Sequence, residues 1–299
     1  EAKSKKIIAV GNKAKKMLGK TPEDIEVTRP IRNGVISDYI MTERMLKIYV
    51  KSAIAKRKIW GKPNICVCVP SGVTDVQRRA ACDAVYRTGA KNVYVLEEPF
   101  AAAIGAGVDI ESAVGAMVVD IGAGTTDIAI VARGGVQHSS SIKIGGDDFD
   151  EAIIRYMRKR HNVLLGESSA EQLKKDIGSV YPREQDAIGY ARGKELVRGL
   201  PTKMAVKSSE MIEACQEETD QILDSVREML EAAPPELVSD ISEHGIILAG
   251  GGSKIFGMDK LIMDKIGVPV VNIKNPDQVV ATGAGTAHYY IKDGRTLEE

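Results

Sequence analysis

The chain has 299 residues, 43% hydrophobic and 27% charged, a composition typical of a globular protein long enough for two domains. Its 41 basic and 41 acidic residues cancel, and only 4% are aromatic, so neither a positive field nor a base-stacking platform favours nucleic acid as a partner. The four cysteines form no CxxC pair or Cys/His cluster, which argues against zinc and for reduced thiols in a cytoplasmic protein. The sequence predicts neither a signal peptide nor a membrane-spanning helix.

The first predicted elements are a short strand over residues 6–10 and a lysine-rich helix over residues 12–18. We expect Thr42 to cap a longer amphipathic helix that continues through Ile54, because apolar residues recur there at helical spacing. Residues 1–34, which precede this longer helix, look like a small exposed unit.

A basic loop over residues 56–63 follows this helix and contains the only tryptophan of the chain, Trp60. Ile59 precedes it, and Lys58 is one of several nearby cations. An exposed tryptophan beside lysines suits the headgroup region of a bilayer. Burial of Trp60 in a core is the alternative, and the residues alone leave both open.

A βαβ pattern comes next, with apolar strands over residues 65–69 and 93–96 around a helix over residues 74–88. Glu97 and Glu98 then open a further helix. Carboxylates at this position complement the positive end of a helix dipole. One of them could instead face a phosphate group and orient an attacking water molecule as a general base.

The run from Asp120 to Asp127 reads Asp-Ile-Gly-Ala-Gly-Thr-Thr-Asp and lies between two apolar strands. Its glycines let a ligand approach the backbone, and successive N–H groups form a nest that suits phosphate oxygens. Asp120 stands at a strand end, where a hydrated Mg²⁺ would bridge to phosphates. The run lacks the helix that follows Walker and dinucleotide loops, so it predicts a strand–turn–strand phosphate clamp, with a flexible hairpin tip as the alternative. The candidate phosphate-binding residues are Gly122, Ala123, Gly124, Thr125 and Thr126.

A second glycine-rich turn follows a buried strand over residues 246–249. Gly250, Gly251, Gly252 and Ser253 come directly after this strand, and we expect a helix from there through residue 263. Backbone N–H groups and a helix dipole at such a place can hold an anion or nucleotide, whereas a tight connection is the alternative. The alternation of strands and helices indicates an α/β fold. Further elements are expected over residues 140–144, 149–160, 169–177, 211–232, 268–273 and 276–290.

Glu171 and Lys174 lie three residues apart in one of these helices and therefore on one face of it. A surface ion pair is the common outcome for such a pair. A ligand contact is the alternative that the glycine-rich turns make relevant.

Seven segments, in this order, cover nearly the whole chain and carry a resemblance. They are residues 19–22, 29–39, 97–105, 118–126, 145–153, 178–182 and 234–241. Together they resemble the MreB/Mbl family of bacterial actins, within the actin-like ATPase superfamily. The resemblance implies a two-lobed α/β fold of four subdomains with ATP and Mg²⁺ between the lobes. The expected subdomains are IB over residues 1–36, IA over 37–115 completed by 283–299, IIA over 116–148 completed by 245–282, and IIB over 149–244.

The resemblance also implies roles for the candidate residues. Glu98 matches the glutamate that polarises the attacking water, Thr125 lies near that water, and Asp120 lies near Mg²⁺ and contacts it through water. Glu171 and Lys174 match residues that reach ribose and adenine, and residues 250–253 match the opposite wall of the adenosine pocket. Lys58, Ile59 and Trp60 fall where the family carries an apolar membrane loop, and the helix near Val76 matches the surface that pairs protofilaments.

On this resemblance, the chain is expected to be a cytoskeletal ATPase that hydrolyses ATP, or GTP, slowly and in step with polymerisation. Antiparallel double filaments would lie on the inner face of the cell membrane and maintain cell shape with membrane proteins of the wall-synthesis machinery. A filament for plasmid or organelle positioning or for motility is the nearest alternative. A sugar or acid kinase and a chaperone ATPase of the same superfamily are more distant ones.

Two features depart from the family pattern. The first phosphate loop of the family, an Asp-Leu-Gly-Thr hairpin, has no match here, so we expect the native protein to extend beyond Glu1. Thr282 stands before Gly283 where the family usually has Lys or Arg.

Overall fold

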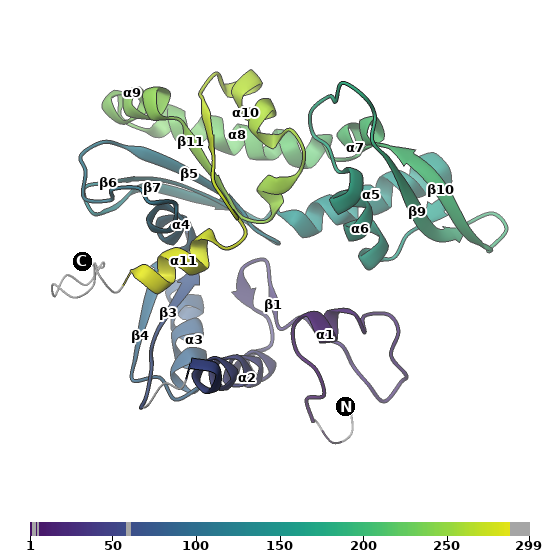
Figure 1. Cartoon of the computed structure of the whole chain (residues 1–299), viewed down its shortest axis with the longest axis horizontal. Coiled ribbons are helices and arrows are strands. Elements are labelled where there is room, and N and C mark those ends of the chain that lie inside the picture. The colour runs from purple at the N-terminus through teal and green to yellow at the C-terminus, as the bar shows by residue number, and fades with distance from the viewer. Residues whose placement is uncertain (2–3, 5, 58–60, 288–299) are drawn as a thin grey trace. The chain divides into compact units, whose positions relative to one another are not determined.

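The computed structural model describes residues 1, 4, 6–57 and 61–287 and divides into two compact units (Figure 1). Unit 1 comprises Glu1–Val67 and Thr74–Tyr94, and unit 2 comprises Cys68–Val73 and Val95–Glu299. The finer division into four subdomains stays a prediction.

Unit 1 contains three helices and a small antiparallel ribbon among its described residues. The helices are α1 (Asn12–Lys15), α2 (Tyr39–Arg57) and α3 (Asp75–Tyr86), and the ribbon pairs β1 (Ile31–Arg32) with β2 (Val35–Ile36). Helix α2 packs against α3. The prediction of a strand over residues 6–10 is wrong, because this segment has no regular secondary structure.

The predicted cap of α2 at Thr42 is also wrong, whereas the predicted start of α3 is confirmed. Helix α2 begins three residues earlier, where Asp38 Oδ1 accepts a hydrogen bond from the N–H of Met41 at 3.0 Å. Thr42 lies within the helix, and its buried hydroxyl donates to the Pro30 carbonyl at 3.2 Å. Thr74 caps α3 in a reciprocal pair of hydrogen bonds with Gln77.

The predicted βαβ pattern is present as β3 (Asn64–Val69), α3 and β4 (Asn92–Glu97), and β3 and β4 form a two-stranded sheet. Helix α4 (Glu98–Ala106) follows β4 directly, with Pro99 in its first turn, where the missing N–H breaks no helical hydrogen bond.

Unit 2 is built on a mixed five-stranded sheet in the order β12-β11-β5-β6-β7. Strands β5, β6 and β7 form an antiparallel meander, while β11 runs parallel to both β5 and β12. Figure 1 shows α4 and α11 on one side of this sheet and α8, α9 and α10 on the other. All seven side chains of β6 are buried, because helices cover both faces. The strands are β5 (Ala116–Ile121), β6 (Thr126–Ala132), β7 (Gly135–Ile142), β11 (Ile246–Ala249) and β12 (Val270–Asn272).

The remainder of unit 2 contains helices around a second sheet, in the order β10-β9-β8. Strands β9 (Ile188–Glu195) and β10 (Pro201–Lys207) form a hairpin that the sequence patterns do not predict, and β8 (Val163–Leu164) pairs with β9. The single helix expected over residues 211–232 is two helices, which meet at Cys215. The helices are α5 (Gly146–His161), α6 (Glu167–Ile177), α7 (Ser208–Ala214), α8 (Gln216–Ala232), α9 (Pro235–His244), α10 (Met258–Ile266) and α11 (Val279–Thr286).

Helices α4 and α11 cross at two glycines. A Cβ atom on Gly105 would lie 2.0 Å from the Val279 carbonyl oxygen, and one on Gly283 would lie 1.8 Å from the Ala101 carbonyl oxygen. These distances are far inside van der Waals contact, so the two backbones touch and only glycine fits at either position. This crossing anchors the helix that carries Glu98.

Replacement of Gly283 by alanine should therefore destabilise the protein by about 1–3 kcal/mol, the usual cost of overpacking, with the Gly105→Ala change acting the same way. Urea unfolding followed by circular dichroism measures the change. Gly285→Ala is the matched control, because it lies in the same helix and a Cβ there meets no atom within 4 Å. An equal loss of stability in all three variants would show that the crossing is not the cause.

Candidate functional site

The predicted glycine-rich hairpin is present, and its register places two aspartates opposite each other. Asp120 of β5 pairs with Asp127 of β6. The four residues between the strands, 122–125, form a tight turn that is closed by a 2.8 Å hydrogen bond from the Gly122 N–H to the Thr125 carbonyl. We call these four residues the glycine turn.

The start of α5 packs on the glycine turn through backbone atoms. The N–H of Gly146 donates to the Gly122 carbonyl at 2.9 Å, and the N–H of Asp147 donates to the Ala123 carbonyl at 2.7 Å. A Cβ on Gly145 would lie 2.7 Å from the carbonyl carbon and oxygen of Ala123, so this contact also requires glycine. Within the described part of the chain, the N–H groups of Ala123 and Gly124 meet no acceptor. The turn thus has its carbonyls engaged and donors available for an anion.

Three carboxylates lie beside this turn. Asp127 is 1% exposed and Asp120 is 4% exposed. Burial, and then the charges of Asp127 and Asp120, raise the pKa of Glu98 in the first turn of α4 to about 8. Burial and Asp127 raise the pKa of Asp120 to about 7. Burial also raises the pKa of Asp127, although the hydroxyls of Ser141 and Thr125 and the amide of Ser71 oppose the shift.

These carboxylates fit a divalent cation, because such an ion would offset both the cost of burying their ionised forms and the repulsion between them. The described residues contain no group of three or more His, Cys, Asp or Glu side chains arranged to hold a metal directly. Mg²⁺ in proteins keeps several waters and takes one or two carboxylates. Asp120 remains the residue that we expect nearest to the ion.

Ser71 is a site residue that the sequence patterns do not reveal. Its buried N–H donates to Asp127 Oδ1 at 2.8 Å, and its hydroxyl donates to Glu97 Oε2 at 2.5 Å. Glu97 therefore contacts Ser71 and also lies near Asp127, whose pKa its charge raises, while Glu98 lies near both aspartates. Asp127 could have been found from the hairpin register, whereas the position of Ser71 depends on tertiary packing.

The two threonines of the predicted clamp differ in their surroundings. Thr126 is fully buried, and its hydroxyl donates to the Ile144 carbonyl at 2.8 Å. The hydroxyl of Thr125 lies beside the Asp127 carboxylate and lowers its pKa. Of the two threonines, Thr125 therefore lies beside the carboxylates, and Thr126 holds the turn in place.

The triple glycine lies next to the same hairpin, since Ala249 at the end of β11 pairs with Asp120. Gly250 has a φ of 81°, and a Cβ there would lie 2.4 Å from Asp120 Oδ1. The prediction that a helix begins directly after the glycines is wrong. Residues 252–254 form one short 3₁₀ turn, and α10 begins only at Met258. A helix dipole therefore does not act at the glycines, and the Ser253 hydroxyl donates to the Gly250 carbonyl at 2.8 Å.

Lys174 links α6 to the start of α5. Its Nζ lies 2.8 Å from Asp150 Oδ1 and also donates to the Gly146 carbonyl. Burial raises the pKa of Asp150 to about 6, although Lys174 opposes the shift. Glu171 forms an ion pair with Lys175 at 2.7 Å. Lys174 thus contacts the same stretch of backbone that holds the glycine turn.

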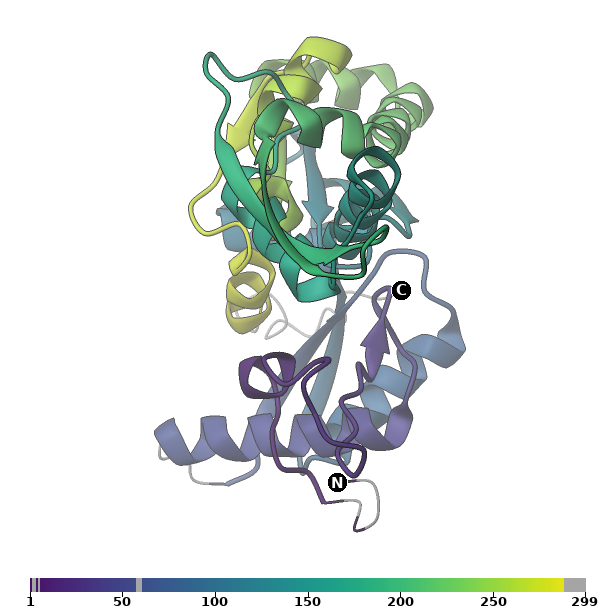
Figure 2. The same cartoon turned by 90° about the vertical axis from the view of Figure 1, so that its right-hand side faces the viewer.

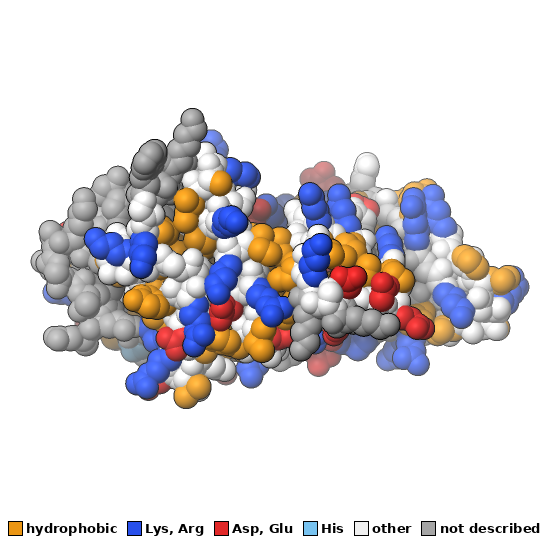
Figure 3. Space-filling model, turned by 90° about the horizontal axis from the view of Figure 1, so that it is seen from below, with side chains coloured by type: hydrophobic (Ala, Val, Ile, Leu, Met, Phe, Trp, Pro, Cys, Tyr) orange, Lys and Arg blue, Asp and Glu red, His pale blue; other side chains and the backbone are white. Residues whose placement is uncertain are grey.

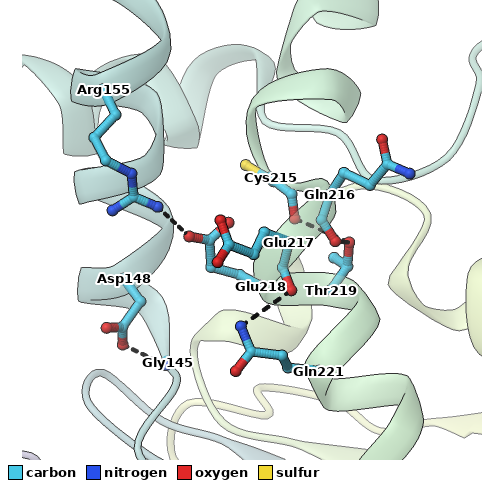
Figure 4. Close-up of polar contacts among 9 residues, drawn as sticks. All are labelled: Gly145, Asp148, Arg155, Cys215, Gln216, Glu217, Glu218, Thr219 and Gln221. Atoms are coloured by element: carbon cyan, nitrogen blue, oxygen red, sulfur yellow. Dashed lines mark hydrogen bonds and ion pairs between the residues drawn. The ribbon is translucent and has the colours of Figure 1, made fainter.

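Helix α5 is held from its other side by α8 (Figure 4). The Arg155 Nη2 atom lies 2.5 Å from Oε1 of Glu218, which is buried, and Asp148 accepts a 2.7 Å hydrogen bond from the Gly145 N–H at the start of α5. Contacts along α5 therefore fix the orientation of its first turn.

The remaining predicted residues lie elsewhere. Val76, in α3 of unit 1, is 76% exposed. Lys58, Ile59 and Trp60 lie outside the described residues. None of the helices that the structure describes is both long and apolar enough to cross a membrane.

The raised pKa of Glu98 predicts a pH-dependent stability for the ligand-free protein. The folded chain binds this proton more tightly than the unfolded chain, so stability is lost as the pH rises from 4.5 towards 8. Glu98→Gln removes this loss and should stabilise the protein at pH 9 by a few kcal/mol, at about 1.4 kcal/mol per pKa unit, with little effect at pH 4. Thermal unfolding in a chelator measures both, and the exposed Glu111→Gln is the control. A stability difference between Glu98→Gln and the wild-type protein that is the same at both pH values would contradict the raised pKa of Glu98.

Comparison with known proteins agrees with this geometry. The sequence model of the MreB/Mbl protein family matches residues 1–296. The chain is 46% identical over 283 residues to the cell shape-determining protein MreB of Escherichia coli K12, covering 95% of this chain and 82% of that protein. It is 41% identical over 282 residues to the cell shape-determining protein Mbl of Bacillus subtilis, covering 94% and 84%.

Solved structures extend the match to the fold. MreB5 of Spiroplasma citri bound to ADP superposes with a TM-score of 0.92 at 34% identity, over 98% of this chain and 88% of that one. The same protein bound to AMPPNP superposes with a TM-score of 0.90. The actin-like α/β fold expected from the sequence is thus confirmed. The chain belongs to the MreB/Mbl family and is an MreB-type cytoskeletal protein.

Proposed function

We propose that the chain binds ATP, or GTP, with Mg²⁺ and hydrolyses it slowly as it polymerises. The observation that carries this proposal is the glycine turn, whose available N–H groups lie beside two buried aspartates and the half-buried Glu98. The structures of MreB5 of Spiroplasma citri, a family member, bound to ADP and to AMPPNP support this proposal.

The phosphates would lie on the backbone N–H groups of Ala123 and Gly124, with Gly122, whose own N–H closes the turn, lining the site. When bound, Mg²⁺ supplies positive charge that offsets the phosphate charge, and Asp120 would hold it through water. Glu98 would orient the attacking water and accept its proton, which requires an ionised carboxylate. A cation near Glu98 favours that ionised form, since it reverses the repulsion from the two aspartates. Thr125 would assist at the water, and Thr126 would contribute its backbone and hold the turn.

The adenosine part would lie between residues of unit 2 that follow the hairpin in sequence. Glu171 and Lys174 of α6 would reach ribose and adenine, and Gly250, Gly251, Gly252 and Ser253 would form the opposite wall. The close approach of Gly250 to Asp120 supports this placement, because any side chain there would displace the carboxylate. Lys174 would have to share its ammonium group with Asp150.

The filament and membrane roles follow from the family rather than from contacts in the structure. We propose double filaments, paired through the exposed surface around Val76, on the inner face of the cell membrane. Ile59 and Trp60, beside Lys58, would contact the lipid. Membrane proteins of the wall-synthesis machinery would be the partners through which the filament maintains cell shape.

Loss of the water-orienting carboxylate should abolish hydrolysis without loss of binding. Glu98→Gln should lower the rate of phosphate release by about 10²–10⁴-fold, the range for a general base, while a fluorescent ATP analogue still binds. Glu97→Gln is the matched control, because Glu97 faces Ser71 instead. A larger loss in Glu97→Gln than in Glu98→Gln would show that the two roles are reversed.

Electron microscopy on anionic liposomes tests assembly. With Mg-ATP, paired filaments should lie flat on the lipid, and Ile59→Ala/Trp60→Ala should form filaments that leave the lipid. Val76→Glu should yield single filaments, because a buried charge at the pairing surface is unfavourable. Monomers of the wild-type protein in every condition, with nucleotide bound, would contradict the filament proposal for this chain.

A further inference from the structure

The sheet of β8, β9 and β10 has one packed face and one open face. Side chains alternate across a strand, and Gly189, Ala191 and Val206 point inward, where Gly189 packs against Leu173 and Ile177 of α6. The outward positions of β9 and β10 are all exposed. In Figure 2 the two strands lie at the front of unit 2, towards the viewer.

The open face is basic and partly apolar. Its outward positions include Arg192, Lys194, Lys203 and Lys207, together with Ile188 and Tyr190, and no Asp or Glu occupies an outward position of either strand. We call these six residues the basic face. Figure 3 shows Lys and Arg side chains beside hydrophobic ones at the end of unit 2 that these strands form.

The charges on this face oppose one another. Arg192 is the direct cross-strand partner of Lys203, and like charges at such positions destabilise a sheet. The Lys203 ammonium group lies 4.3 Å from the centre of the Tyr190 ring, and neither cation is within ion-pair distance of a carboxylate in the described part of the chain. An arrangement that costs stability in the free protein indicates an anionic partner.

The turn of the same hairpin adds exposed apolar side chains. Val197 is 78% exposed and Leu200 is 57% exposed, and Arg198 lies between them. Large apolar side chains at the tip of a hairpin, flanked by cations, match the chemistry of a membrane–water interface.

Neither protection of a sheet edge nor a second copy of the chain accounts for the whole of this surface. Lysines on the edge strand β10 would discourage unwanted strand pairing. Arg192 and Lys194, however, lie on the middle strand β9, which pairs with β10 and, at Lys194 and Glu195, also with β8. A second copy could present the acidic outer side of α8, which includes Glu217, Asp220 and Glu228, but that surface offers nothing apolar to the hairpin tip.

We propose that the basic face and the tip of the β9–β10 hairpin bind an anionic lipid membrane. The cations attract the headgroups, and Val197 and Leu200 enter the headgroup region. This surface belongs to unit 2 and is separate from residues 58–60, so the proposal does not depend on nucleotide binding or on the membrane loop.

The test is sedimentation of the full chain with vesicles of phosphatidylcholine, with and without phosphatidylglycerol, in wild-type and Ile59→Ala/Trp60→Ala backgrounds. Arg192→Gln/Lys203→Gln should weaken binding to the anionic vesicles by roughly 5-fold per charge, or on the order of 25-fold, and should make binding less sensitive to salt. Val197→Ser/Leu200→Ser should weaken it as well. Arg227→Gln/Lys265→Gln removes the same charge from α8 and α10 and should leave affinity within about 2-fold.

Thermal unfolding provides the folding control, because removal of the opposed pair Arg192 and Lys203 should keep or raise the melting temperature. Unchanged affinity of the folded Arg192→Gln/Lys203→Gln variant for anionic vesicles would overturn the proposal. So would equal binding to neutral vesicles, or binding of this face to poly-glutamate with none to lipid. A loss of vesicle binding only in Ile59→Ala/Trp60→Ala would support the membrane loop and reject the basic face.

Discussion

Burial of two aspartates side by side at the end of one hairpin is the constraint on which the rest of unit 2 depends. The antiparallel register makes Asp120 and Asp127 partners, and their burial raises the pKa of both. Three neighbouring residues contact or surround these carboxylates. The Ser71 N–H donates to Asp127, Gly250 leaves room for the Asp120 carboxylate, and Glu98 faces both from α4. A cluster of carboxylates assembled at such cost suits a cation.

The scaffold around this cluster is rigid because backbone contacts, rather than long side chains, hold it. Helix α5 meets the glycine turn through two N–H groups, and α4 meets α11 through Gly105 and Gly283. Lys174 and Glu218 hold α5 from two other helices. Displacement of α5 would therefore move the glycine turn.

Local patterns predicted the elements whose physics is local. The hairpin around residue 120, the cap of α3 and the glycine-rich turns follow from apolar runs, capping chemistry and backbone freedom. The hairpin of β9 and β10 was missed because its inward positions hold small residues such as Gly189 and Ala191, which fit against α6, while its outward positions hold cations. That alternation has the period of a strand but lacks its apolar signal. Thr42 failed as a cap because Asp38 was available earlier in the chain.

By itself, the sequence determined the α/β class, the family and the order of the glycine-rich turns along the chain, since each is written in contiguous residues. Only the tertiary structure decided that Ser71 joins the site and contacts Glu97, and that the triple glycine lies beside Asp120 without a helix dipole. These facts depend on strand register and burial between residues far apart in the chain. A pKa or a close approach is a property of the packed surroundings, which no contiguous motif records.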